Sequence, residues 1–216
     1  MAPPIWCGAA VELVGMSDRV RVWCLRHAES ENVAGGIAGV VPAAPLTARG
    51  RREAMAAARV LGCEPVARIY CSTALRTQQT AAALASNASL DVVALAELTE
   101  VGIGKHEGVS DPAVRRQTAD VLRAWIVERD LDQRVADGES GREVLARVDA
   151  AFRQIAATHS GEIVVVVGHV ASLTLAVAWL CRLGSHVWGR PLPHAEPFLV
   201  EWDGSAWHCA AWPNRS

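Results

Sequence analysis

The hydrophobic positions of the chain form short apolar runs that alternate with longer segments of helical periodicity. The runs 20–25, 68–71 and 163–167 are rich in β-branched and aromatic residues, which is typical of strands. The run 163–167 contains no polar residue, as expected of a parallel strand that is buried on both faces. The pattern therefore predicts strands at these three places.

Helix signals lie between and after these runs. Thr47 can cap a helix that ends before Gly62, and Ser72 or Thr73 can cap the helix after the second strand. A cap and a first-turn proline at 111–112 predict a helix that continues to about residue 128. A capping box at 140–143 predicts a helix whose apolar face packs on the sheet.

Strands that alternate with helices predict an α/β fold, a three-layer α/β/α sandwich with a mostly parallel central sheet. The segments 198–202 and 206–208 predict a closing hairpin. The 216 residues suffice for one substantial core, so we predict a single domain over 19–216. Residues 1–18 are expected to form a disordered extension, with Met16 as an alternative natural start.

Composition narrows the class of protein. The formal net charge of −2 argues against a protein that binds nucleic-acid backbones. Residues 163–183 are apolar enough to suggest a membrane span, but Gly168 and His169 interrupt them, so a strand, turn and helix are predicted instead. The six cysteines lack metal-like spacing and no signal peptide is evident, which predicts reduced thiols in a cytoplasmic protein.

Arginine and histidine side chains follow the ends of the predicted strands. Arg26 and His27 follow the first run, and His169 follows the third. Arg76 falls in the first turn of the helix after the second run, where a cation is poorly matched to the helix dipole and indicates a bound anion. Each residue alone could be an ordinary surface residue. Together, at the carboxyl edge of a parallel sheet, they predict a phosphate site.

These residues occur in motifs that resemble a known family, the histidine phosphatase superfamily, also called phosphoglycerate mutase-like. Residues 26–29, Arg-His-Ala-Glu, are similar to its opening Arg-His-Gly-acidic motif. Residues 45–50 resemble its Pro-Leu-Thr-x-x-Gly segment, and residues 72–81 its Ser-x-Leu-x-Arg-x-x-x-Thr-Ala pattern, with a one-residue shift. Further matches, in family order, are Leu98-Thr99-Glu100 with Gly104 and Glu107-Gly108, Gly138-Glu139-Ser140 with Arg147, and Gly168-His169.

The resemblance implies a role for each matching residue. His27 would be the nucleophile, and Arg26, Arg76 and His169 would hold the phosphoryl group. Glu100 would protonate the leaving group, although Glu97 and Glu107 crowd the same loop. The chain also departs from the family pattern: Ala28 replaces a glycine, His106 an aromatic residue, and Val170-Ala171 a glycine pair. Asn32, a candidate phosphate ligand, comes one residue earlier than usual.

Phosphoryl transfer requires positioning and positive charge around the equatorial oxygens. Arg26 and Arg76 can each donate two parallel hydrogen bonds, so no metal or cofactor is required. A neutral His27 can attack phosphorus and divide one hard step into two easier ones. A general acid such as Glu100 contributes about 100-fold or more to the rate.

These inferences predict a metal-independent phosphomonoester hydrolase of the histidine acid-phosphatase type, acting through phospho-His27 on a small phosphorylated metabolite. The segment 110–137 is shorter than the insertion that caps phosphoglycerate mutases of the family, and a thinner cover favours water as the acceptor. The alternatives are a phosphoglycerate-type phosphomutase and a catalytically weak phospho-ligand-binding module. Specificity is expected from 103–137 and from the loop around Gly35 and Gly36; the sequence does not indicate the oligomeric state.

Overall fold

A computed structural model describes residues 18–86 and 90–213, so the extension expected to be disordered lies outside the described residues apart from Asp18. Within them the chain forms a six-stranded sheet in the order β3-β2-β4-β1-β5-β6. The first four strands in that order are parallel, whereas β5 is antiparallel to β1 and to β6. The strands are β1 (Val20–Arg26), β2 (Val66–Cys71), β3 (Val92–Ala94), β4 (Ile163–Gly168), β5 (Phe198–Trp202) and β6 (Trp207–Cys209).

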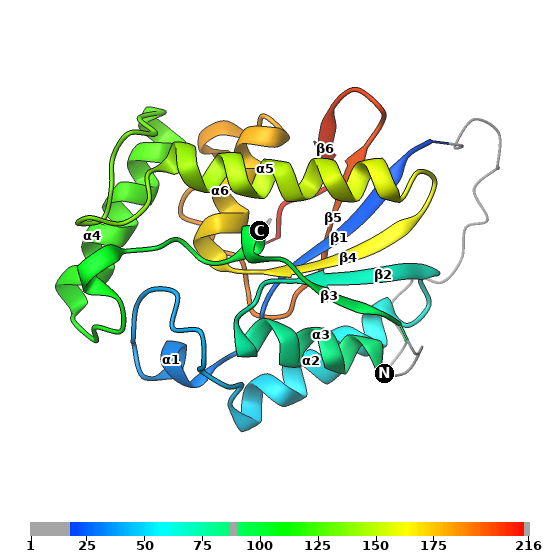
Figure 1. The fold of residues 1–216 in the computed structure, drawn as a ribbon, viewed down its shortest axis with the longest axis horizontal. Helices are drawn as coiled ribbons and strands as arrows, with labels where there is room; N and C mark the ends of the chain where they lie inside the picture. Colours follow the sequence, from blue (N-terminus) through cyan, green and yellow to red (C-terminus); the bar gives the residue numbers. More distant parts are fainter. Residues whose placement is uncertain (1–17, 87–89, 214–216) are drawn as a thin grey trace.

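Helices cover both faces of this sheet, which confirms the three-layer α/β/α architecture (Figure 1). On one face lie α2 (Ala48–Leu61) and α3 (Leu75–Ala85), and on the other α5 (Gly141–Thr158) and α6 (Val170–Leu180). Helix α4 (Pro112–Arg123) lies at one end of the molecule, at the left in Figure 1. The remaining helical segments are α1 (Glu31–Ala34), η1 (Ala96–Leu98), η2 (Gly104–His106), η3 (Ala124–Glu128) and η4 (Gly184–Val187).

The alternation of side chains along the central strands divides the core into two layers. Val164 and Val166 of β4 pack in the cluster that holds Phe152 of α5. Val165 and Val167, one residue out of phase, pack in the cluster under α2 and α3. Successive side chains of a strand point to opposite faces, so the unbroken apolar run of β4 supplies both layers. Each fully buried valine of this kind stabilises the fold by about 1.5–3 kcal/mol.

Most helix boundaries agree with the sequence signals. The Thr47 hydroxyl accepts the Gly50 N–H, and the capping box between Ser140 and Glu143 is complete. The backbone and side-chain bonds from Ser140 and the ion pair with Arg134 hold the pKa of Glu143 down, to about 2. The helix expected to reach residue 128 does so, but its last turn is the π-helix η3.

Two local features differ from expectation. The N-cap of α3 is Ala74, not Ser72 or Thr73. The Ser72 hydroxyl does accept the Ala74 N–H at 3.2 Å, but the chain enters the helix two residues later than predicted. Strand β3 was not predicted, because its three residues are largely exposed and carry too short an apolar signal to separate from loop.

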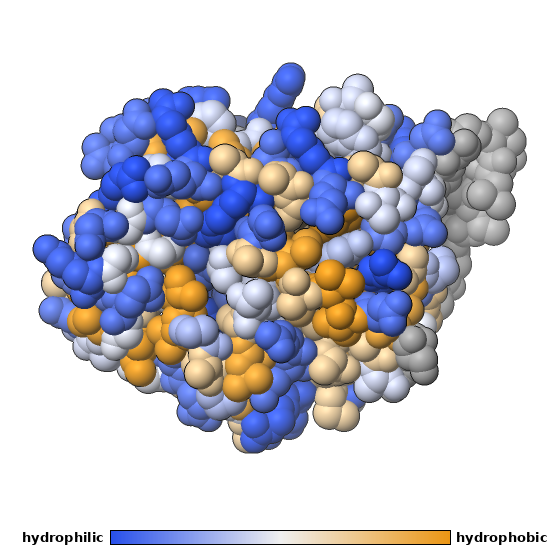
Figure 2. Space-filling model, viewed as in Figure 1, coloured by the Kyte–Doolittle hydropathy of each residue, from blue (hydrophilic) through white to orange (hydrophobic). Residues whose placement is uncertain are grey.

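The surface is mostly hydrophilic on the face shown in Figure 2, where apolar residues interrupt it across the middle. The exposed large apolar side chains among the described residues are Met55 and Val60 of α2, Leu75 of α3 and Val92 of β3. No helix in the described ranges is both long and apolar enough to cross a membrane.

Candidate active site

The two histidines of the sequence motifs lie side by side at the carboxyl edge of the parallel strands. Arg26 is the register partner of Gly168 across β1 and β4, so the residues that follow them, His27 and His169, emerge together. Their ring centroids are 5.2 Å apart in an edge-to-face arrangement. This is the edge at which open α/β sheets bind ligands.

His27 is fixed in one tautomer by its own backbone. Its Nδ1–H donates to the carbonyl of Ala28 at 2.7 Å, which leaves Nε2 unprotonated, and Nε2 accepts a hydrogen bond from Arg76 Nε at 3.2 Å. The imidazole is only 3% exposed. Burial, followed by the charge of Arg76, holds the pKa of His27 well below its ordinary value. His27 is therefore neutral, and the electron pair of its Nε2 is directed at the Arg76 guanidinium.

Arg76 connects the two imidazoles. Besides its bond to His27, its Nη2 lies 3.2 Å from His169 Nδ1. The guanidinium is 1% exposed and also donates to the carbonyls of Val40 and Val41 at 2.8 and 2.7 Å. Burial lowers its pKa, but an arginine stays charged in a protein. The site thus holds a buried cation whose partners here are neutral groups.

Arg26 adds a second guanidinium from the end of β1. Its Nη1 donates to the carbonyl of Leu192 at 3.2 Å. Its Nε is buried and has no hydrogen-bond partner among the described residues. An unsatisfied buried donor is costly, and a bound anion or water would satisfy it.

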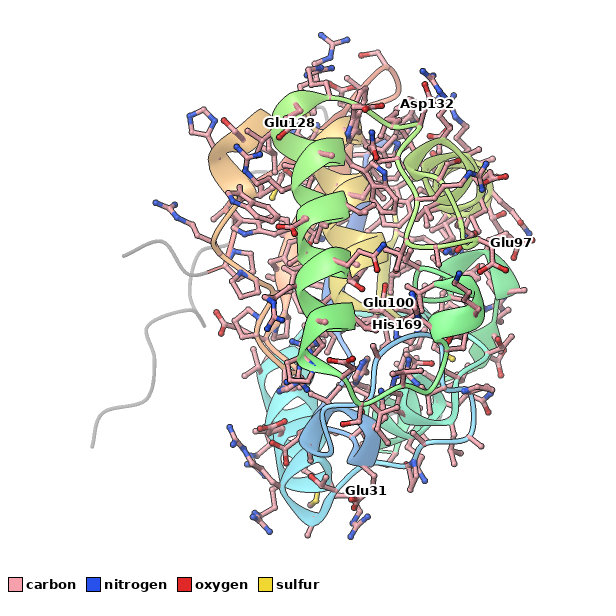
Figure 3. The ribbon with its side chains drawn as sticks, turned by 90° about the vertical axis from the view of Figure 1, so that its left-hand side faces the viewer. Glu31, Glu97, Glu100, Glu128, Asp132 and His169 are labelled. Atoms are coloured by element: carbon pink, nitrogen blue, oxygen red, sulfur yellow. The ribbon has the colours of Figure 1, made fainter. Side chains whose placement is uncertain are left out.

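Glu100 lies in front of the first turn of α6. Its carboxylate accepts the backbone N–H groups of Ser172 and Ala171 at 3.0 and 3.3 Å, and that of Val101 at 2.9 Å. Free N–H groups and the helix dipole both favour a carboxylate at this position. Figure 3 shows Glu100 beside His169 near the middle of the molecule.

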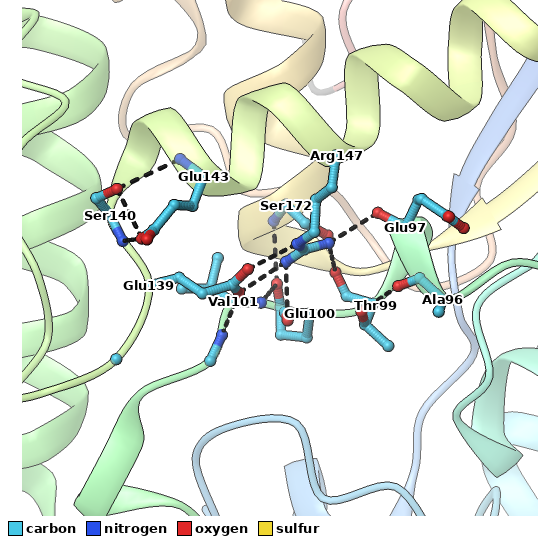
Figure 4. A network of polar contacts seen from close by, with 12 residues as sticks. Ala96, Glu97, Thr99, Glu100, Val101, Glu139, Ser140, Glu143, Arg147 and Ser172 are labelled. Carbon is cyan, nitrogen blue, oxygen red and sulfur yellow. Dashed lines mark hydrogen bonds and ion pairs between the residues drawn. The ribbon is translucent and has the colours of Figure 1, made fainter.

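The loop that carries Glu100 is held by a half-buried ion pair that involves Glu139 of the Gly-Glu-Ser signature. Arg147 of α5 donates to both carboxylate oxygens of Glu139 at 2.8 and 2.9 Å (Figure 4). The same guanidinium donates to the carbonyls of Glu97, Thr99 and Glu100 at 2.7–3.1 Å. The signature therefore positions the backbone of Glu100 and does not reach the site itself.

A cavity of about 240 Å³ opens in front of these groups. Arg26, His27, Arg76 and Glu100 line its inner end. Its outer wall comes from the two segments expected to determine substrate specificity. Gly36 and Ile37 belong to the loop around Gly35 and Gly36, and Ile103, Arg115 and Thr118 belong to the segment 103–137. Arg115 ties the two segments together, because its Nη1 donates to the carbonyl of Gly36 at 2.9 Å.

The model of the histidine phosphatase superfamily (branch 1) matches residues 22–215 of this chain. The chain belongs to this superfamily. Phosphoserine phosphatase 1 of Hydrogenobacter thermophilus is 30% identical over 155 residues, covering 71% of this chain and 72% of that protein. A probable phosphoglycerate mutase GpmB of Enterobacter sp. (strain 638) is 27% identical over 195 residues, covering 89% and 90%. The structure of Bacillus stearothermophilus YhfR superposes with a TM-score of 0.77 at 25% identity, covering 91% and 98%.

The other two glutamates of the loop that carries Glu100, Glu97 and Glu107, do not line the cavity. Glu97 is exposed, and Figure 3 shows it at the edge of the molecule. Glu107 accepts the backbone N–H groups of Val40 and Ile103 at 2.7 and 2.8 Å. Glu107 therefore connects two loops, the one whose Val40 and Val41 carbonyls bind Arg76 and the one that carries Glu100. Of the three glutamates, Glu100 is the one that lines the cavity.

Asn32 lines the cavity, but its amide is engaged in the fold. Its Oδ1 accepts the Ser30 hydroxyl at 2.7 Å, and its Nδ2 donates to the Ile37 carbonyl at 3.4 Å. His106 is partly exposed in η2 and does not line the cavity. Of these two residues, Asn32 is thus the one within reach of a ligand.

Two residues close to the candidate site, Arg115 and His194, were not identified from the sequence. Arg115 belongs to the expected specificity segment, but nothing in its helical setting marks it. His194 lies in a loop, pairs with Arg26 in an isolated bridge, and brings its ring centroid to 6.1 Å from that of His27. Its buried Nε2 has no partner among the described residues. No motif signals this residue, because the pairing joins positions far apart in the sequence.

The described ranges contain no group of three or more His, Cys, Asp or Glu side chains arranged to hold a metal ion.

Proposed function

We propose that the protein is a phosphomonoester hydrolase that works through a phosphohistidine at His27 and needs no metal. The observation that carries the proposal is the position of Arg76, a buried cation that bridges two neutral imidazoles at the inner end of a cavity. Two guanidiniums there supply the positive charge that phosphoryl transfer requires. The phosphatase relatives of the family support the same reading.

In the first step, Nε2 of His27 attacks phosphorus and the ester P–O bond breaks. Glu100 enters this step protonated on Oε2, whose backbone contact is the 3.3 Å bond from the Ala171 N–H, and gives that proton to the leaving oxygen. In the second step, the Glu100 carboxylate takes a proton from water, the water oxygen bonds to phosphorus, and the P–N bond breaks. Arg26 and Arg76 hold the equatorial oxygens throughout, as preorganised donors, and His169 joins them when its Nδ1 carries a proton.

Water is the acceptor that the proposal favours. The cover over the cavity comes from α4 and the loops beside it, and a short cover gives water access to the phosphoenzyme. The mutase relative keeps a phosphomutase as the second candidate. Measuring phosphate release and the interconversion of 3-phosphoglycerate with the same preparation separates the two, because interconversion without release would overturn the hydrolase.

The substrate class follows from the size of the site. A cavity of about 240 Å³ suits a small phosphorylated metabolite.

We also propose that residues 19–216 fold as one domain and that the protein is cytoplasmic. The thiols of Cys24 and Cys71 are buried, and burial raises the pKa of Cys71 to about 11, which keeps it a neutral core group.

The decisive experiment traps the intermediate. Wild-type protein, His27→Ala and the matched control His208→Ala are incubated with a phosphomonoester, quenched in alkali and analysed for acid-labile phosphohistidine. His208 is exposed on β6. We expect trapping and turnover in the wild type and the control, and neither in His27→Ala. Equal turnover in His27→Ala would mean that the nucleophile is wrong, and loss of wild-type turnover in a chelator would contradict metal independence.

A further inference from the structure

The hydroxyl of Ser72, which the proposed mechanism does not use, is part of a buried hydrogen-bond chain that ends on His169. Ser72 Oγ lies 2.7 Å from His169 Nε2 and 2.8 Å from Thr77 Oγ1. Thr77 Oγ1 lies 2.7 Å from the Ala74 carbonyl. All three side chains are at most 1% exposed, so water does not compete for these bonds.

Counting protons gives this chain a direction. Arg76 can only donate, so the contact of its Nη2 with His169 Nδ1 requires an unprotonated Nδ1. Neutral His169 must then carry its proton on Nε2 and donate to Ser72 Oγ. The single Thr77 proton is used by backbone carbonyls, so the Ser72 proton goes to Thr77 Oγ1. Every proton in the chain therefore has an acceptor, and the Thr77 proton is shared between two carbonyls.

This arrangement conflicts with the binding of an anion. The unprotonated Nδ1 of His169 lies 3.2 Å from Nη2 of Arg76, the guanidinium proposed to hold the phosphoryl group. An anion bound to that guanidinium would meet the electron pair of Nδ1, which is repulsive. A proton on Nδ1 would turn the repulsion into a charge-assisted hydrogen bond. His169 cannot gain that proton by exchanging tautomers while its Nε2–H is held by Ser72.

We infer that Ser72 is a positioning residue that couples the binding of a phosphate-like dianion to the uptake of one proton by His169 Nδ1. The proton comes from solvent or from a phosphate monoanion, whose O–H bond breaks as the N–H bond forms. The inference rests on the proposed phosphate site. The charged or titratable groups that act on His169 are His27 and Arg26 from β1, Arg76 from α3 and Arg147 from α5, with Glu100 in front of α6.

Replacing Ser72 by alanine removes the acceptor for Nε2–H. His169 is then free to carry its proton on Nδ1, so it can donate to the anion as a neutral group. We therefore expect Ser72→Ala to take up one proton fewer than the wild type on binding. Thr77→Val should act in the same direction, because Ser72 loses its acceptor and can turn its own proton toward Nε2.

The test is titration calorimetry with sulfate, which stays a dianion across pH 6–9, in buffers of different ionisation enthalpy. For the wild type we expect proton uptake and an affinity that falls about tenfold per pH unit for each linked proton. His27 could also take up a proton on sulfate binding, but this would raise the measured proton uptake of the wild type and of Ser72→Ala equally. The quantity that tests the inference is therefore the difference in proton uptake between these two proteins. The matched control is Thr174→Ala, which removes a buried hydroxyl of α6 that bonds the Val170 carbonyl and should leave the uptake unchanged.

Nitrogen NMR of the imidazoles gives a second measurement that does not depend on the variants folding. In the anion-free wild type we expect His169 protonated at Nε2 only, and in the sulfate complex at both nitrogens. Sulfate binding without proton uptake, equal uptake in folded Ser72→Ala, or an Nδ1–H tautomer in the free protein would overturn this inference alone. Failure of both sulfate and phosphate to bind would overturn the proposed function and this inference with it.

Discussion

Arg147 offers a test of how the fold positions the proposed acid. Its guanidinium donates hydrogen bonds to three backbone carbonyls between residues 97 and 100 and to both carboxylate oxygens of Glu139. The Arg147 side chain is 18% exposed. Arg147→Ala removes all of these bonds and leaves the Glu139 carboxylate without its cation. Hydrogen bonds to charged groups contribute about 1.5–3 kcal/mol each but are not additive, and this ion pair is only half-buried, so we expect the free energy of unfolding to fall by about 1.5–3 kcal/mol.

The same variant should lose activity in a way that depends on the leaving group. Glu100 donates a proton only if its carboxyl group stays in front of α6, and a misplaced general acid costs about 100-fold in rate. We expect this loss for alkyl phosphates, whose leaving oxygen needs a proton. The loss should be much smaller for p-nitrophenyl phosphate, whose leaving group departs as a stable anion.

The measurements are urea denaturation and kcat for the two substrates. Arg153→Ala is the matched control, because Arg153 lies on the same helix in an exposed pair with Asp149, and such pairs contribute at most about 0.5 kcal/mol. Equal losses with both substrates in a folded Arg147→Ala would refute the positioning of Glu100. An Arg147→Ala variant as stable as the wild type would show that the hydrogen bonds of Arg147 do not stabilise the fold.

Three further outcomes follow from the structure. Burial lowers the pKa of His27 and His169 in the folded protein, so below the unfolded-state histidine pKa of about 6.5 the unfolded chain binds more protons than the folded one. The free energy of unfolding should therefore fall on acidification, by up to about 1.4 kcal/mol per pH unit for each histidine. Denaturation at several pH values measures this, and a flat profile would contradict two neutral imidazoles. Gly50→Ala would place a Cβ 1.9 Å from the Glu29 carbonyl oxygen, which should cost about 1–3 kcal/mol by denaturation; an unchanged midpoint would show that α2 shifts freely. Phe152→Ala should cost about 3–5 kcal/mol, because this ring is fully buried against Trp207, and a smaller loss would mean that the core collapses around the cavity.

The sequence carried the fold and the inner end of the site because both depend on local signals. In the sequence, the ends of β1 and β4 are marked by the points at which their apolar runs stop, near Arg26 and Gly168. These two residues pair across the strands, because the carboxyl ends of neighbouring parallel strands lie at the same edge of the sheet. The choice of Glu100 over Glu107 rested on motif spacing. The physical distinction is position, because both carboxylates accept backbone N–H groups but only Glu100 of the two lines the cavity.

What the sequence could not give depends on contacts between distant segments. His194 approaches His27 through a loop that is apart from every motif. The role of Arg147 is equally hidden, because its acceptors are backbone carbonyls and any residue type supplies a carbonyl. The direction of the Ser72 chain can be assigned only when the neighbours of His169 are known on both sides of the ring.

The way in which Arg76 is accommodated shows why its site is a property of the whole fold. A cation in the first turn of a helix is opposed by the helix dipole and, when buried, loses its hydration. Two successive carbonyls, those of Val40 and Val41, turn toward its guanidinium, and Val41 adopts a left-handed conformation with φ of 34°. A β-branched residue rarely takes that conformation, at a cost of about 1–3 kcal/mol. The fold sustains this strain because Glu107 anchors the same loop through Val40 N–H. The surrounding loops therefore hold a buried positive charge, whose direct hydrogen-bond partners are neutral groups, next to the position proposed for the phosphoryl group.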